Sequence, residues 1–259
     1  MLSIPSVAGS PSWIALATPD QEAANAFYGA LFGWEFRPAG PGSGGHGRYL
    51  LDGRTVAGSV QGTQERPGGP SWSVCFHSAD TGATGRAVVA AGGSAMSGPH
   101  EVGSLGRLSG FRDSTGAPFS VREPGDRPGM EVVNDPGTLC WTELHTTDVP
   151  AAAAFYRSVF GWEINSAPYP GGTYTMAAPA GRGPEANTGG FVRIAGAGAG
   201  HWLPYFEVSD TDAVAASARR LGGSVEMEPV DLPGVGRLAR ATDPHGARFS
   251  LITSVSAAA

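Results

Sequence analysis

The sequence predicts an α+β fold built from four modules, each with the order strand, helix, strand, strand, strand (βαβββ). The first observation behind this prediction is an internal duplication, because Phe32-Gly33-Trp34-Glu35 recurs as Phe160-Gly161-Trp162-Glu163, 128 positions later. The second is that each half repeats an apolar strand followed by an amphipathic helix. The third is the composition: 40 glycines and 21 prolines fall largely between aromatic and β-branched runs, where they mark turns between short strands.

The duplication runs through most of the chain, and the matching positions are mainly aromatic, glycine and aspartate residues. The pairs are Trp13 and Trp141, Phe27-Tyr28 and Phe155-Tyr156, Trp72 and Trp202, Gly92-Gly93 and Gly222-Gly223, Gly106-Arg107 and Gly236-Arg237, and Asp113 and Asp243. The polar, turn-rich segments 124–129 and 134–137 separate the halves. We therefore expect a first domain over residues 8–124 and a second over residues 137–255, each with two βαβββ modules.

The first half shows the expected order of elements. An apolar strand over residues 13–18 precedes a helix over residues 20–32, in which Asp20 caps the start and Gly33 ends the helix. Strands near residues 49–51 and 56–61 complete the first module. The second module repeats the order, with a strand at 71–77, a helix at 81–91 and strands at 106–111 and 119–122.

Composition and charge exclude several classes of protein. The formal net charge is −6 and no cluster of Lys and Arg stands out, so nucleic acid is not an expected partner. No apolar run approaches the roughly 20 residues that span a bilayer, and the first residues lack the basic and apolar regions of a signal peptide. We expect a cytoplasmic protein with a small-molecule ligand and no membrane partner, present as a monomer or a homodimer.

Two motifs carry a resemblance to a known family. One is Asp-x6-Phe-Tyr-x3-Phe-Gly-Trp, at residues 20–34 and again at 148–162. The other is an Asp-[Ser/Pro]-x-Gly turn before the last strand of each half, at residues 113–116 and 243–246. On these motifs the chain resembles a tandem-duplicated member, of the hydroxylase-like glyoxalase-domain type, of the glyoxalase/bleomycin resistance/dioxygenase (vicinal oxygen chelate) superfamily. The resemblance implies two domains, each with a curved mixed sheet around a ligand-binding cavity.

Metal-dependent members of that family hold a divalent ion with His, Gln or Glu from the first strands of modules and a Glu from the last strand. The positions that the motifs align with those ligands are Trp13, Trp141, Ser73, Leu203, Ser120 and Ser250. An indole offers only an N–H donor and a serine hydroxyl is a weak ligand. The resemblance therefore implies that the metal ligands are not retained, and we expect neither a metal nor another cofactor.

A displaced metal site is the alternative. Glu143 and His145 follow Trp141 on one face of a strand, because side chains alternate with a period of two. Together with His201 and Glu207 they could supply such a site. The opposing interpretation is that Glu143 ends a strand or pairs with an Arg, and that His201 is an exposed strand start.

The two halves differ at these polar positions. The second half has Glu143, His145 and Glu207 where the first has Ala15, Ala17 and His77. Polar groups that face a cavity cost free energy unless they are paired, so this asymmetry favours a functional site in the cavity of the second half. The candidate catalytic residues are His145 as general base and Glu143 and Glu207 as acids or orienting groups. Drift on an exposed face is the alternative.

Aromatic residues on strands are candidates for a wall on which a flat ligand stacks, with core packing as the alternative. Small-molecule sites are typically large apolar pockets with a few polar groups. The predicted ligand-binding residues are Trp141, Tyr205, Trp202, Tyr174, Ser250, Trp13, Trp72 and His77.

These observations favour a metal-independent protein that binds a hydrophobic or aromatic small molecule, as in antibiotic resistance by sequestration. The alternative is a cofactor-free isomerase, cyclase or lyase of secondary metabolism in which His145 works with Glu143 or Glu207. A metal-dependent dioxygenase or glyoxalase is the third hypothesis, which the ligand positions argue against.

Overall fold

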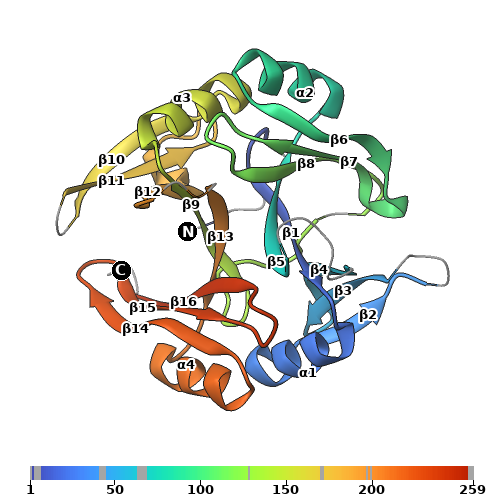
Figure 1. Cartoon of the computed structure of the whole chain (residues 1–259), viewed down its shortest axis with the longest axis vertical. Coiled ribbons are helices and arrows are strands. Elements are labelled where there is room, and N and C mark those ends of the chain that lie inside the picture. The colour runs from blue at the N-terminus through green and yellow to red at the C-terminus, as the bar shows by residue number, and fades with distance from the viewer. Residues whose placement is uncertain are drawn as a thin grey trace. The chain divides into compact units, whose positions relative to one another are not determined.

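The computed structural model describes Leu2 and residues 7–40, 45–62, 69–127, 129–169, 172–196, 198 and 200–255. Its elements follow one another as four βαβββ modules, which confirms the α+β class and the predicted module order (Figure 1). Within this part of the chain, none of the helices combines the length and the apolar character needed to cross a bilayer.

The first half of the chain supplies two modules. The first comprises β1 (Pro11–Thr18), α1 (Gln21–Phe32), β2 (Glu35–Pro38), β3 (His46–Leu51) and β4 (Arg54–Gln61). The second comprises β5 (Ser71–His77), α2 (Thr81–Ala90), β6 (Ser94–Glu101), β7 (Gly106–Arg112) and β8 (Pro118–Pro124).

The second half supplies two more modules. The third comprises β9 (Leu139–Thr146), α3 (Val149–Phe160), β10 (Glu163–Tyr169), β11 (Gly172–Ala178) and β12 (Gly189–Arg193). The fourth comprises β13 (His201–Glu207), α4 (Thr211–Arg220), β14 (Ser224–Leu232), β15 (Gly236–Thr242) and β16 (Arg248–Ser254).

The strands form mixed sheets. Their hydrogen-bonded orders are β2-β3-β4-β1-β5-β8-β7-β6 and β10-β11-β12-β9-β13-β16-β15-β14. In each module the first strand pairs in parallel with the last, as β9 does with β12, and the remaining strands pair antiparallel. The first strand after each helix (β2, β6, β10 or β14) therefore lies at an edge of its sheet.

The modules group into two compact units. One unit, containing residues 1–13, 73–130 and 141–203, includes the second and third modules. The other, containing residues 14–72, 131–140 and 204–259, includes the first and fourth. Each unit thus takes one module from each half of the sequence. The bounds 8–124 and 137–255 describe the sequence repeat, and as domain limits they remain a prediction.

Aspartate caps begin the four α-helices. The side chains of Asp20, Asp80, Asp148 and Asp210 each accept a hydrogen bond from the backbone N–H three residues further on, at 2.8–3.0 Å. Such a cap satisfies one of the N–H groups that a helix start leaves free. The predicted cap at Asp20 is confirmed, and the predicted end at Gly33 is confirmed by its left-handed φ of 75°.

A buried chain of three polar side chains, here the Tyr156 triad, connects the second and third modules within their unit. Trp202 donates from Nε1 to the Tyr156 hydroxyl (2.9 Å), which donates to Asp113 Oδ2 (3.0 Å). Burial, followed by the nearby Asp113, raises the pKa of Tyr156 well above its ordinary value, so the hydroxyl keeps its proton. Asp113 Oδ1 accepts hydrogen bonds from the N–H groups of Thr115 and Ala117 and thereby shapes the turn before β8.

The same arrangement, the Tyr28 triad, joins Tyr28 of the first module to Asp243 of the fourth within the other unit, with Trp72 from the start of β5 as its third member. Trp72 donates to the Tyr28 hydroxyl (3.0 Å), which donates to Asp243 Oδ2 (3.2 Å). The tyrosine belongs to the Asp-x6-Phe-Tyr motif and the aspartate to the late turn motif. The two parts of the sequence signature are therefore the two ends of one buried contact.

Tyr156→Phe is predicted to lower the free energy of unfolding by about 1–3 kcal/mol, because it leaves the Trp202 N–H and Asp113 Oδ2 buried without this partner. Urea denaturation measures the change, with Tyr169→Phe, at a side chain that is 47% exposed, as the matched control. Equal stability of the two variants would contradict a structural role for the triad.

Candidate functional site

Strand β9 presents three predicted site residues on one face. Trp141, Glu143 and His145 occupy alternate positions, so their side chains leave the same side of the strand. Glu143 and His145 are only 6% and 4% exposed, whereas Trp141 is half-buried. Two ionisable side chains at this depth need polar partners.

Those partners form a continuous set of hydrogen bonds, called here the Glu143 network. His145 Nε2 lies 2.8 Å from Glu143 Oε2. The Tyr174 hydroxyl, on β11, donates to Glu143 Oε1 at 2.8 Å. Trp141 donates from Nε1 to the Tyr174 oxygen at 3.0 Å. Both carboxylate oxygens of Glu143 are thus occupied by side chains of the same unit.

The chemistry of these groups fixes the direction of the hydrogen bonds. An ionised carboxylate only accepts, so Tyr174 and His145 must both donate to Glu143. The Trp141 indole only donates, which leaves the Tyr174 hydroxyl proton for Glu143. With Glu143 ionised, His145 therefore donates from Nε2, and a neutral imidazole in that tautomer has its lone pair on Nδ1.

Gly190 on β12 makes room for this network. It pairs in register with Glu143, and a Cβ at this position would collide with the Tyr174 hydroxyl. Sequence reasoning did not single out Gly190, although the Gly189-Gly190 pair inside an apolar run is a signal of close approach in a strand.

His201, at the start of β13, extends the polar cluster. Its ring centroid lies 5.0 Å from that of His145, with 46° between the ring planes. A Cβ at the preceding Gly200 would come within 2.6 Å of the His145 carbonyl oxygen, so the glycine permits this approach. Glu143 lies in the middle of β9, and His201 is half-buried. The interpretation of Glu143 as a strand end is wrong, whereas His201 does start strand β13, half-buried rather than exposed.

The other predicted site residues have different surroundings. Trp72 and Trp202 lie in buried aromatic clusters as parts of the two triads, so their contacts are those of core residues. Trp13 is also buried, near the start of β1. A ligand-binding role for these tryptophans remains a prediction.

Besides Trp72, three predicted residues belong to the unit of the first and fourth modules. Tyr205 and Ser250 are paired in register on β13 and β16, and both are buried. Glu207 accepts hydrogen bonds from Ser254, from its N–H at 2.9 Å and from its hydroxyl at 2.6 Å. These hydrogen bonds hold the end of β16 in place, so Glu207 has a structural role within its unit.

The side chains do not fit a divalent metal at the positions that the family resemblance implies. Trp141 points its only polar hydrogen at Tyr174, Leu203 is apolar, and Ser250 offers a single hydroxyl. In the displaced alternative, the Glu143 and Glu207 carboxylates each accept two hydrogen bonds from protein groups, and this site remains a hypothesis. Among the residues that the structure describes, no three His, Cys, Asp or Glu side chains are grouped closely enough to hold an ion.

His77 lies beside a buried cation in the unit of the second and third modules. It pairs in register with Arg122, which is 3% exposed and donates to the backbone carbonyls of Leu105 and Arg127. Burial, and then the charge of Arg122, lower the pKa of His77. The imidazole is therefore kept neutral, and its predicted ligand-binding role remains a prediction.

The depressed pKa of His77 predicts a loss of stability in acid. Above the unfolded pKa of about 6.5, His77 is neutral in both states and stability is complete. As the pH falls below about 6.5, the unfolded chain binds a proton that the folded chain resists, so the free energy of unfolding decreases. Between about pH 7 and pH 5, wild type should lose more stability than His77→Gln, by less than about 1.4 kcal/mol per pH unit. Identical pH slopes for the two proteins, with the exposed-site variant His100→Gln as control, would contradict this.

Comparisons with known proteins agree with the fold. Residues 13–122 match the family described as glyoxalase-like domain, and residues 138–251 match the glyoxalase/bleomycin resistance protein/dioxygenase superfamily. The 2,3-dioxygenase LapB from Pseudomonas sp. KL28 superimposes with a TM-score of 0.68 at 13% identity, covering 97% of this chain and 94% of LapB. The Mn(II)-bound glyoxalase from Novosphingobium aromaticivorans gives 0.64 at 15% identity, covering 96% and 83%.

Two relatives are similar in sequence over nearly their whole length. The anthracycline biosynthesis protein DauV from Streptomyces sp. strain C5 is 37% identical over 273 residues, covering 94% of this chain and 93% of DauV. CFP32 from Mycobacterium bovis, whose name proposes a glyoxylase, is 37% identical over 249 residues, covering 94% of each chain. The chain therefore belongs to the glyoxalase/bleomycin resistance/dioxygenase superfamily.

Proposed function

We propose that this chain is an enzyme of secondary metabolism that uses His145 and Glu143 for metal-independent acid–base chemistry on an aromatic small molecule. The observation that carries the proposal is the buried 2.8 Å contact between His145 Nε2 and Glu143 Oε2, with Tyr174 on the second carboxylate oxygen. A base held in one orientation by a carboxylate, which a third group orients in turn, is a recurring arrangement in enzymes that move protons.

In this proposal each member of the Glu143 network has a role. His145 Nδ1 accepts a proton from an acidic C–H or O–H group of the substrate, and Glu143 stabilises the imidazolium that forms. The proton then returns to a different substrate atom, so an isomerisation, cyclisation or elimination proceeds without an external oxidant or reductant. Tyr174 and Trp141 keep Glu143 in place. A positioned general base typically contributes a factor of about 10²–10⁴ to the rate.

The relatives and the aromatic residues support the substrate class. DauV and DnrV, the latter from Streptomyces peucetius and 38% identical over 261 residues, are both named as anthracycline biosynthesis proteins. Trp141 and Tyr174, two aromatic members of the Glu143 network, are half-buried. A polycyclic aromatic molecule with an ionisable C–H or O–H group suits both features. Sequestration without chemistry is the second candidate, because the same two rings would suit a binding protein.

Hydrogen–deuterium exchange into a bound substrate tests the proposal. A thermal-shift screen against polycyclic aromatic natural products identifies ligands, and mass spectrometry then follows deuterium uptake from D2O at an acidic carbon. His145→Asn is predicted to slow uptake by about 10²–10⁴-fold while the ligand still binds. Glu143→Gln should also slow deuterium uptake, and dialysis of the protein against EDTA before the assay should leave the uptake rate unchanged.

The matched control is His100→Asn, at an exposed histidine on β6, which should exchange like wild type. Uptake that survives His145→Asn, or that requires added iron or manganese, would overturn the acid–base proposal. Binding without uptake in wild type, lost on Trp141→Ala, would establish sequestration instead.

A further inference from the structure

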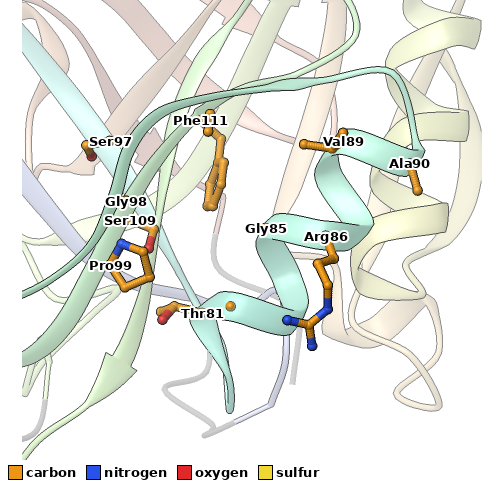
Figure 2. A pocket seen from close by; sticks show the side chains of 12 residues that line it. Thr81, Gly85, Arg86, Val89, Ala90, Ser97, Gly98, Pro99, Ser109 and Phe111 are labelled. Atoms are coloured by element: carbon orange, nitrogen blue, oxygen red, sulfur yellow. The ribbon is translucent and has the colours of Figure 1, made fainter.

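The second module has a pocket beside strands of the sheet that does not contain the Glu143 network. It lies between helix α2 and strands β6 and β7, with a volume of about 510 Å³ (Figure 2). This volume is within the range of about 300–1,000 Å³ that is typical of small-molecule sites. Phe111, Val89 and Pro99 contribute the apolar walls, and Phe111 lies against the backbone of Gly85.

Small residues account for the space. Gly82 and Gly85 on α2 and Ala95, Ser97 and Gly98 on β6 line the pocket. The duplicated fourth module has larger side chains at every one of these positions, namely Asp212, Ala215, Val225, Met227 and Glu228. A Cβ at Gly98 would meet no atom within 4 Å, so a side chain there is sterically allowed and the open space is a property of this sequence.

One positive charge lies at the rim of the pocket. Arg86 is exposed on α2, and Figure 2 shows its side chain extending toward the Thr81 end of the helix. In the fourth module, Asp212 and Glu228 form ion pairs with Arg237 and Arg219, whereas their counterparts here are glycines. The nearby Asp80 accepts the helix-capping hydrogen bond from Ala83. Within the described residues, Arg86 forms no ion pair of 4.0 Å or less, although the pKa of Asp80 is lowered by the hydrogen bond from Ala83 and, in smaller part, by the charge of Arg86.

A buried hydroxyl is the second polar feature. Ser109 on β7 lines the pocket and is 1% exposed. Among the described residues, its Oγ has no hydrogen-bond partner. A buried hydroxyl without a partner is costly, and a polar atom of a ligand that reaches it would remove that cost.

We infer that this pocket is a second ligand site, specific for an aromatic molecule with one anionic group such as a carboxylate. The ring occupies the space between Phe111, Pro99 and Val89, the anionic group faces Arg86, and a polar atom reaches Ser109. The inference does not depend on the acid–base chemistry proposed for His145, because the pocket shares no residue with the Glu143 network.

Isothermal titration of the full chain with 2-naphthoate and with neutral 2-naphthamide tests the site. Wild type should bind the carboxylate about five- to tenfold more tightly than the amide, because the guanidinium strengthens the hydrogen bond to an anion. Arg86→Gln should remove that preference and leave the amide affinity unchanged. Ser97→Met and Gly98→Glu, which install the residues of the fourth module, should each weaken naphthoate binding by tenfold or more.

Controls separate this site from the other one. Gly98 and Arg86 are exposed, so their variants should melt like wild type, whereas Ser97→Met also removes the hydrogen bond that Ser97 Oγ accepts from the Gly110 N–H; thermal unfolding measures the stability of each variant. His145→Asn should leave naphthoate affinity unchanged, and the methyl NMR signals of Val89 should shift on titration. Naphthoate binding that survives both Ser97→Met and Gly98→Glu, that fails to distinguish carboxylate from amide, or that is absent at millimolar ligand would overturn the inference.

Discussion

A buried tyrosine hydroxyl bonded to an aspartate carboxylate recurs in both compact units, and much of the structure depends on this contact. A carboxylate removed from water must have its oxygens satisfied. Asp113 uses one oxygen for the N–H groups of its own turn and the other for Tyr156, so the turn before β8 and the helix α3 have to meet. The aspartate and the tyrosine come from different halves of the sequence. The need to satisfy the buried carboxylate therefore brings a module of the first half into contact with a module of the second half.

Much of this fold was predictable from the sequence because its determinants are local. The capping aspartates, the glycine that ends α1 and the apolar first strands each predict an element from a few neighbouring residues. Strands β2 and β6 were not located, since they are edge strands whose side chains are largely exposed and show no apolar alternation. The grouping of the modules into two units could not be predicted from local sequence patterns. It depends on contacts between residues that are far apart in the sequence, such as Tyr156 and Asp113, which are 43 positions apart.

The candidate site was predictable in part. Period-two spacing placed Trp141, Glu143 and His145 on one face, and the structure joins the last two directly. The position of Tyr174 as the second partner of Glu143 required the strand order β11-β12-β9, which no local pattern specifies. Glu207 shows the converse, because a favourable strand position did not reveal that its carboxylate is occupied by Ser254.

The two copies share one structural contact and differ at the polar positions of the candidate site. Both copies keep the tyrosine–aspartate contact, whereas Ala15 and Ala17 stand in the first copy where Glu143 and His145 stand in the second. Retention of the shared contact maintains the fold in both units. The Glu143 network lies on strands β9 and β11, and Gly190 on the intervening strand β12 leaves the space that the Tyr174 side chain needs.

The central claim is that Glu143 fixes His145 as a metal-free base with its lone pair on Nδ1. Nitrogen-15 NMR of the imidazole ring in the full chain near neutral pH tests it most directly. The account predicts a protonated Nε2 and an unprotonated Nδ1 for His145, and a change in this tautomer balance in Glu143→Gln. A protonated Nδ1 with a bare Nε2, or signals of a metal-bound imidazole that vanish on treatment with EDTA, would contradict it.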